Sequence, residues 1–151
     1  TFENIIEKTL QRITPLLKSD NIKLITNLNC SKPINSFQTE IVQVLLNLLK
    51  NSQEALIENK TDNPMITINT YCKSSKAYLE VLDNAGGLNE EHLDIIFDPY
   101  FTTKSNKDGS GLGLYMSKTI IENHCKGTLD VINNKNGARF IISIDICEKT
   151  I

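Results

Sequence analysis

Two asparagines, Asn47 and Asn51, lie four residues apart in a strongly apolar stretch of the chain. In a helix this spacing places both amides on one face. An amide oxygen suits Mg²⁺, which keeps several waters and shares phosphate oxygens with its protein ligands. A buried amide pair with a purely structural role is the alternative when these residues are taken alone.

A second candidate is Asp83, which ends a predicted strand and is followed by Asn84-Ala85-Gly86-Gly87-Leu88. Taken alone, the segment fits a simple turn. A carboxylate in that place can also accept a hydrogen bond from an exocyclic amine such as that of adenine. The small residues after it let a planar base approach the backbone.

A glycine-rich run, Gly109-Ser110-Gly111-Leu112-Gly113-Leu114, opens a predicted helix whose free N–H groups could bind an anion. It does not follow a strand, so it is not the dinucleotide-binding fingerprint, and no GxxxxGK[ST] phosphate loop occurs. Before it, Phe97 to Lys104 places aromatics beside hydroxyls and a lysine, which alone indicates only a loop anchored on the core.

The elements that must position these residues follow from apolar periodicity and turn residues. Pro15 is expected to kink or shorten the first helix, and Ser36 is a candidate N-cap of the second. The order predicts an α+β fold: a two-layer sandwich with a mixed or antiparallel sheet and helices on one face. The predicted helices are 2–18, 37–57, 89–96 and 112–124, and the predicted strands are 22–28, 65–72, 76–83, 128–132 and 138–146.

Length and composition restrict the possible functions. The 151 residues fit one domain, and a formal charge of −2 gives no basic field for nucleic acid or anionic membrane. No apolar run approaches the roughly 20 residues of a membrane-spanning helix. The four dispersed cysteines form no CxxC pair, so we expect reduced thiols and no zinc site.

In combination, these segments resemble the catalytic and ATP-binding domain of bacterial two-component sensor histidine kinases, in the GHKL superfamily. QVLLNLLKNSQEAL (43–56) is similar to the N box, LDNAGGL (82–88) to the G1 box and FDPYFTTK (97–104) to the F box. GSGLGLYMSKTIIENHCKG (109–127) is similar to the G2 box and its helix, and NGARF (136–140) to the closing strand. The resemblance implies a Bergerat-type ATP-binding fold with a flexible ATP lid.

The resemblance also implies roles for individual residues. Asn51 would ligate Mg²⁺, with Asn47 on the same polar face, and Asp83 would bind the adenine amine. Lys104 would neutralise charge on the phosphates during transfer. The remaining residues implied to bind ATP are Gly87, Phe97, Thr102, Thr103, Gly109, Gly111, Leu112, Gly113 and Leu114.

Three positions qualify the resemblance. Ala85 stands where the family's G1 box has its first glycine, so Gly86 would have to supply the flexibility. Glu54 stands where many of these kinases have a cation that touches phosphate. Asn47 stands where the hydrolytic members have a water-activating Glu, and an amide cannot act as that base. The last difference favours a kinase over an ATPase.

We therefore expect residues 1–151 to be one catalytic domain that transfers the γ-phosphoryl group of Mg²⁺-ATP to a histidine on a separate helical domain. His92 and His124 lack the context of a phosphoacceptor and are expected to be structural. The expected partners are the dimerisation and phosphoacceptor domain of the same kinase, absent here, and a response regulator. The domain is expected to be monomeric and cytoplasmic, whether or not the parent protein is membrane-anchored. The alternatives are a serine/threonine kinase of the anti-sigma type and a non-catalytic nucleotide sensor.

Overall fold

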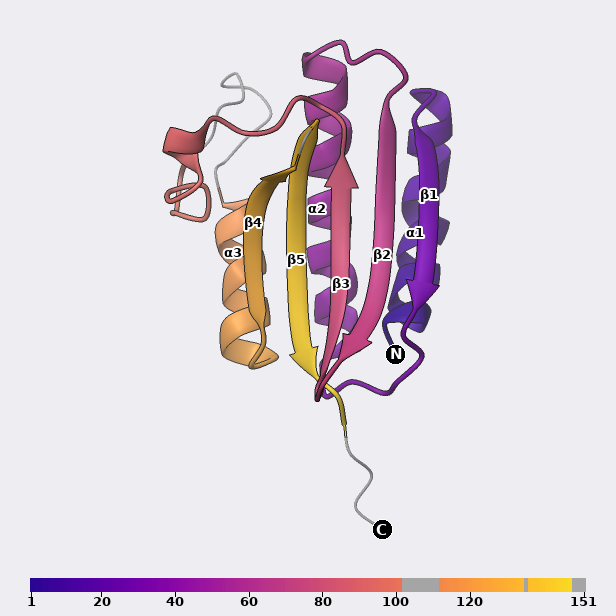
Figure 1. Cartoon of the computed structure of the whole chain (residues 1–151), viewed down its shortest axis with the longest axis vertical. Helices are drawn as coiled ribbons and strands as arrows, with labels where there is room; N and C mark the ends of the chain where they lie inside the picture. Colours follow the sequence, from indigo (N-terminus) through magenta and orange to yellow (C-terminus); the bar gives the residue numbers. More distant parts are fainter. Residues whose placement is uncertain (102–111, 135, 148–151) are drawn as a thin grey trace.

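The computed structural model describes residues 1–101, 112–134 and 136–147. Its centre is a five-stranded mixed sheet in the order β1-β2-β3-β5-β4 (Figure 1). Strand β1 runs parallel to β2, and the other neighbours are antiparallel. The strands are β1 (Lys23–Asn29), β2 (Met65–Lys73), β3 (Lys76–Asp83), β4 (Thr128–Asn134) and β5 (Gly137–Asp145).

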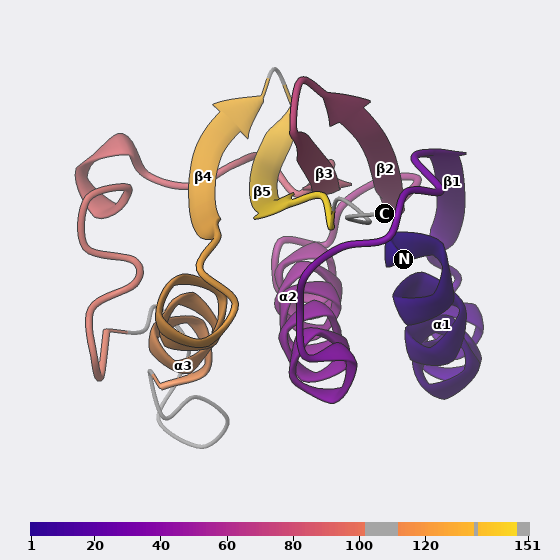
Figure 2. The ribbon, with the colours of Figure 1, turned by 90° about the horizontal axis from the view of Figure 1, so that it is seen from below.

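The helices α1, α2 and α3 cover one face of this sheet, which Figure 2 shows from below. The two-layer α+β sandwich predicted from the sequence is thereby confirmed. Strand β3 illustrates why the layers form: Ala77, Leu79 and Val81 alternate along the strand and are fully buried beneath the helices. Among the described residues, no helix combines the length and apolar character needed to cross a bilayer.

Helix α1 (Phe2–Ser19) begins at Thr1, whose hydroxyl accepts a hydrogen bond from the Asn4 N–H. Pro15 lies inside the helix, so the expectation that it ends the helix early was wrong. Proline removes the hydrogen bond to the carbonyl four residues earlier, here Gln11. Both residues lie on the exposed side of the helix, where water can replace the missing hydrogen-bond donor.

Helix α2 (Gln38–Glu58) is the central helix of the layer, and its apolar face is buried against the sheet. Its N-cap is Phe37 and not Ser36 as predicted, and no side chain caps the first turn. The helix forms without that cap because its buried face packs over the whole length of the sheet. Its fully buried residues include Ile41, Leu45, Leu48 and Leu49.

The remaining helical segments are short. The predicted helix 89–96 is only a turn of 3₁₀-helix, η1 (Glu90–His92), capped by the Asn89 side chain. The predicted helix 112–124 is present as α3 (Gly113–Thr119), continued by a π-helical turn, η2 (Ile120–His124). Such π-turns are rare and often lie beside functional sites.

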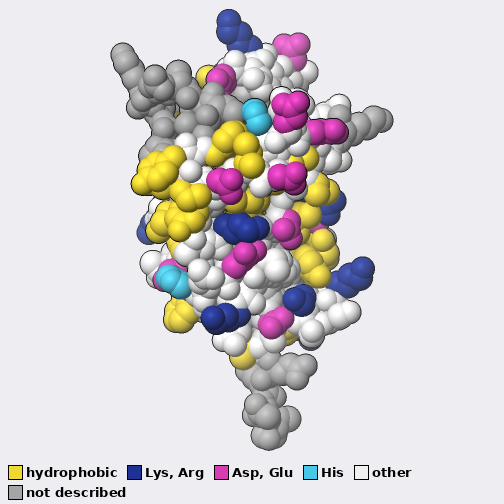
Figure 3. Space-filling model, turned by 90° about the vertical axis from the view of Figure 1, so that its left-hand side faces the viewer, with side chains coloured by type: hydrophobic (Ala, Val, Ile, Leu, Met, Phe, Trp, Pro, Cys, Tyr) yellow, Lys and Arg dark blue, Asp and Glu magenta, His cyan; other side chains and the backbone are white. Residues whose placement is uncertain are grey.

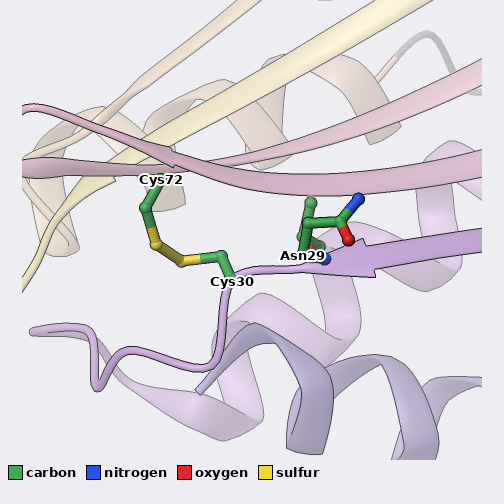
Figure 4. Close-up of a disulfide and its surroundings, with 4 residues drawn as sticks. Asn29, Cys30 and Cys72 are labelled. Atoms are coloured by element: carbon green, nitrogen blue, oxygen red, sulfur yellow. A yellow bond between two sulfur atoms is a disulfide. The ribbon is translucent and has the colours of Figure 1, made fainter.

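A disulfide bond joins Cys30, just after β1, to Cys72 near the end of β2 (Figure 4). The expectation of four reduced thiols was therefore wrong. Parallel pairing of β1 with β2 ends with Asn29 beside Tyr71, so the next residue on each strand is a cysteine. Their Cα atoms are 5.4 Å apart, within the range that a disulfide spans. Cys125 and Cys147 are free, the first buried and the second exposed.

Candidate nucleotide-binding site

Asp83 ends β3 at the edge of the helical layer, where its carboxylate is held by backbone donors. Its Oδ1 accepts hydrogen bonds from the N–H groups of Ala85 at 3.1 Å and Ala138 at 3.2 Å. Gly137 makes this approach possible, because a Cβ there would lie 1.8 Å from the Asp83 carbonyl oxygen. Only glycine fits beside Asp83 at that point of β5.

Burial raises the pKa of Asp83 above its ordinary value, and the backbone hydrogen bonds from Ala85 and Ala138 partly oppose this shift. The buried Ser52 hydroxyl on α2 lies close enough to lower the carboxyl pKa as well. The same hydroxyl has no hydrogen bond of good geometry within the described part of the chain. Asp83 and Ser52 thus form a polar spot inside an apolar layer, which suits a ligand that brings its own donor.

Two asparagine side chains fix the segment that follows Asp83. Asn84 accepts from the Met65 N–H at 2.8 Å and donates to the Asn63 carbonyl at 3.0 Å. Asn59, at the end of α2, donates to the Ala85 carbonyl at 2.7 Å. These bonds attach the segment to both neighbouring layers, so the backbone after Asp83 is pre-formed.

The backbone conformation of this segment explains how Ala85 can stand where the family has a glycine. Ala85 is buried and has no positive φ, whereas Gly86 has a φ of +98° and Gly87 a φ of +83°. The left-handed conformations therefore fall on the two glycines, and alanine is accommodated without backbone strain. The side chain of Asn133 on β4 exchanges two hydrogen bonds, each 2.8 Å, with the backbone of Leu88.

Gly113 brings the start of α3 into direct contact with Asn47 on α2. A Cβ at Gly113 would lie 2.6 Å from the Asn47 amide oxygen, closer than any real contact. One turn further along α3, the Ser117 hydroxyl accepts a hydrogen bond of 3.0 Å from the Asn47 amide nitrogen. Asn47 thus links α2 to α3, so the structure gives it a definite positioning role.

Asn51 lies one turn beyond Asn47 on α2 and is partly buried. Leu112 is the N-cap of α3, and Leu114 packs against the hydrophobic core. The structure thus gathers Asn47, Gly113 and Leu114 at one contact between α2 and α3. Five predicted site residues lie outside the described residues: Thr102, Thr103, Lys104, Gly109 and Gly111.

Phe97 anchors its loop on the core, as the sequence taken alone indicated. Its ring packs edge-on against Phe140 of β5, with centroids 6.3 Å apart. The Lys118 ammonium lies 4.6 Å from the Phe97 ring centroid and donates to the Leu129 carbonyl. Phe97 therefore anchors the segment before the undescribed residues to the sheet and to α3.

A separate cleft of about 680 Å³ lies between this segment, α3 and β4. Figure 3 faces this side of the molecule, where acidic side chains are scattered around the hydrophobic ones. The lining carries four carboxylates against the single cation of Lys118, so it would repel phosphate groups. Its acidic lining residues are Asp94, Asp98, Glu122 and Asp130.

Both histidines make structural contacts, as expected from the sequence. His92 packs edge-on against Phe101, with ring centroids 5.0 Å apart. His124 at the end of η2 lies 3.1 Å from a carboxylate oxygen of Glu40 on α2. These contacts tie short elements to longer ones.

Sequence inspection missed several residues that position the site. Ser52, Ser117 and Asn133 are ordinary polar residues whose importance depends on partners far away in the chain. Gly137 lies in the NGARF segment recognised as a closing strand, but its contact with Asp83 was not foreseen. Gly137 could have indicated this contact, because a glycine in a strand often marks the close approach of another backbone segment.

The chain belongs to the family of histidine kinase-, DNA gyrase B- and HSP90-like ATPases, whose model matches residues 37–148. That range contains α2, the Asp83 segment and the helix that starts at Gly113. All of the elements described above that carry the candidate site therefore lie within the matched range.

Sensor proteins are similar to this chain in sequence. The two-component sensor PprA of Pseudomonas aeruginosa is 33% identical over 110 residues, which cover 71% of this chain and 12% of PprA. The sensor histidine kinase ZraS of Escherichia coli (strain K12) is 31% identical over 144 residues, covering 94% of this chain and 30% of ZraS. The chain thus spans less than a third of the length of either relative.

Solved structures show the same fold. The catalytic domain of histidine kinase ThkA aligns with a TM-score of 0.82 and 29% identity, covering 95% of this chain and 91% of that one. A complex of ThkA with the response regulator TrrA aligns with a TM-score of 0.79 and 27% identity, covering 97% of this chain and 41% of that one. The fold is therefore that of a histidine kinase catalytic domain.

Proposed function

We propose that this chain binds Mg²⁺-ATP between α2, the segment after Asp83 and the start of α3. One observation carries the proposal: Asp83 is a partly buried carboxylate whose Oδ1 takes both backbone hydrogen bonds. The remaining acceptor capacity of this carboxylate suits the exocyclic amine of adenine, which needs an acceptor. The positive φ angles of Gly86 and Gly87 keep the adjoining backbone free of side chains that would obstruct a flat base.

The residues on α2 fit a magnesium ion. Asn51 would supply an amide oxygen to Mg²⁺, and Asn47 would hold α3 against α2 beside it. The bound ion would draw negative charge from the phosphate oxygens and orient them for transfer. We assign Thr102, Thr103, Lys104, Gly109 and Gly111 to the same nucleotide site on the basis of the family motif alone.

The chemistry that we propose is transfer of the γ-phosphoryl group from ATP to a ring nitrogen of a histidine, with release of ADP. The protein's part is to position the phosphates and balance their charge. Asn47 offers no base to activate water, so ATP is protected from hydrolysis until the histidine arrives. The similarity to sensor kinases favours this chemistry over an anti-sigma-type kinase or a non-catalytic sensor.

The acceptor histidine would lie on a dimeric helical domain of the parent kinase, and a response regulator would receive the phosphoryl group. The complex of ThkA with TrrA supports the second partner. We propose that residues 1–151 form one monomeric domain that works in the cytoplasm, where ATP is available.

Titration calorimetry of the purified chain with ADP and a non-hydrolysable ATP analogue, with and without Mg²⁺, tests the site. We expect Asp83→Asn to weaken binding of either nucleotide by about 10- to 100-fold, since a hydrogen bond to a charged group is worth roughly 1.5–3 kcal/mol. Asn51→Asp should change the Mg²⁺ dependence with little effect on metal-free ADP. Asp62→Asn, on an exposed turn, is the matched control.

The transfer step needs a supplied phosphoacceptor domain and radiolabelled ATP. Acid-labile label on that domain is the expected result, because phosphohistidine hydrolyses in acid whereas phosphoserine survives. Acid-stable label would favour the serine/threonine kinase. A wild-type chain that binds no adenine nucleotide would refute the proposed function.

A further inference from the structure

Three of the four cysteines meet at one end of the sheet, away from the nucleotide site. Cys72, already bonded to Cys30, lines a surface hollow of about 720 Å³ together with the free Cys147. Lys32 lines the same hollow. A disulfide and an unpaired thiol therefore share one exposed pocket beside a cation.

Backbone hydrogen bonds hold Cys147 in this place. Its N–H donates to the Pro33 carbonyl at 2.8 Å, in the segment that follows Cys30. The N–H of Ile146 donates to the Ser75 carbonyl at 2.9 Å, in the turn that follows Cys72. Ile146 also forms a β-bridge with Ile34. Cys147 is thus fixed between the two chain segments that carry the bonded cysteines.

The surroundings favour reaction at Cys147 and Cys72 over Cys30. Cys147 is exposed, Cys72 is partly exposed and Cys30 is only 3% exposed. The thiolate is the attacking form of cysteine, and Cys147 is the exposed free thiol that lines the hollow. Exchange requires access to one sulfur of the disulfide, and Cys72 is the bonded cysteine that lines the hollow.

We infer that this hollow is a thiol–disulfide exchange site in which Cys72 alternates between Cys30 and Cys147. The Cys147 thiolate attacks Sγ of Cys72, the bond from Cys72 to Cys30 breaks, and Cys30 leaves as a thiolate. Cys30 then takes up the proton that Cys147 released. One disulfide replaces another, so the step needs no external oxidant.

The exchange would change what the bond connects. The Cys30–Cys72 bond ties the edge strand β1 to β2 and closes a loop that contains α2, with its Asn47 and Asn51. A Cys72–Cys147 bond would instead tie β2 to the segment after β5 and release β1. If the domain works in the cytoplasm, as the proposed function implies, a reversible bond also fits the rule that disulfides there are mostly transient or redox-sensing.

Peptide mapping of the full chain tests the site without nucleotide, so its outcome is independent of the proposed function. The oxidised protein is held at pH 8 without added thiol, quenched with acid and N-ethylmaleimide, and digested with pepsin. We expect wild type to yield both Cys30–Cys72 and Cys72–Cys147 peptides. Cys147→Ser should yield only the first, and Cys125→Ser should match wild type because that thiol is buried elsewhere.

A second variant isolates the new bond. Cys30→Ser, incubated with reduced and oxidised glutathione, should form a monomeric Cys72–Cys147 disulfide in most molecules. Adding Cys147→Ser should remove it and leave Cys72 free or bonded to glutathione. Finding only the Cys30–Cys72 peptide in wild type would overturn the inference, as would free Cys72 and Cys147 in folded Cys30→Ser.

Discussion

At the scale of single residues, the Asp83 carboxylate lowers the stability of the ligand-free fold and provides the acceptor proposed for the adenine amine. A carboxylate that is mostly withdrawn from water disfavours its own charge, and the raised pKa of Asp83 records that cost. Two backbone N–H groups and the nearby Ser52 offset only part of it. A site of this kind remains costly until a ligand supplies a further donor.

Asp83→Asn should therefore stabilise the ligand-free chain at neutral pH while weakening adenine binding. Below the ordinary carboxyl pKa of 3.8, Asp83 is protonated in both folded and unfolded states. As pH rises, the unfolded state ionises first and the folded state holds the proton longer, so stability falls until the raised folded pKa is passed. In urea denaturation, the free energy of unfolding of Asp83→Asn should exceed that of wild type by more at pH 7 than at pH 4. A difference that does not change with pH would contradict this account.

Gly113→Ala tests the contact between α2 and α3. The new methyl would lie 2.6 Å from the Asn47 amide oxygen, so α3 must move or Asn47 must rotate. We expect a loss of roughly 1–3 kcal/mol in the free energy of unfolding, as for other overpacked contacts, together with weaker nucleotide binding. In an Asn47→Ala background the stability loss should disappear, because the clashing atom is gone. Chemical denaturation of wild type, the two single variants and the double variant gives the coupling free energy between Gly113 and Asn47.

At the scale of elements, β3 and β5 are joined across the face of the sheet that no helix covers. Glu80 of β3 is 3% exposed and accepts a hydrogen bond of 2.6 Å from Arg139 of β5. A second contact between the same side chains makes the pair bidentate. Tyr71 and Tyr78 stack on this face with centroids 4.9 Å apart. The hydrogen bond with Glu80 raises the pKa of Arg139, so the guanidinium stays charged throughout the usual pH range.

Arg139→Met should destabilise the fold by about 2 kcal/mol, because it leaves the Glu80 carboxylate buried without its cation. The estimate lies below that for a fully buried pair, since the Arg139 side chain is 31% exposed. Glu80→Leu combined with Arg139→Met should recover most of the loss. The surface pair Lys76–Asp145, on the same two strands, is the control, and Lys76→Met should change stability by less than about 1 kcal/mol. Guanidinium denaturation of these variants measures each effect.

At the scale of the whole molecule, the Cys30–Cys72 disulfide encloses α2 and links the edge strand to the sheet. The bonded residues are 42 positions apart, so the bond removes much conformational freedom from the unfolded chain. Reduction should lower the free energy of unfolding by about 2–4 kcal/mol. Thermal melts with and without a reductant measure the difference. The Cys30→Ser/Cys72→Ser variant should not respond to reductant, and a response there would assign the effect to another thiol.

Much of the fold could be predicted from local pattern, because alternation in β3 and the apolar face of α2 are properties of neighbouring residues. The errors arose where packing overrode a local rule. Pro15 lies on the exposed side of α1, and the helix continues past it. Phe37 replaces Ser36 at the start of α2 because the buried face of that helix, not its cap, determines stability.

The residues that could do the chemistry were recognisable from local sequence: Asp83 after a strand, Asn47 and Asn51 on one helical face, and glycines before a helix. The contacts that hold these residues became visible only in the folded protein. The fit of Gly137 beside Asp83 and of Gly113 beside Asn47 depends on chain segments more than fifty residues apart. The pairing of Cys30 with Cys72 depends on the register of β1 against β2. Distances between remote segments are set when the sheet and helices pack together, and no local pattern encodes them.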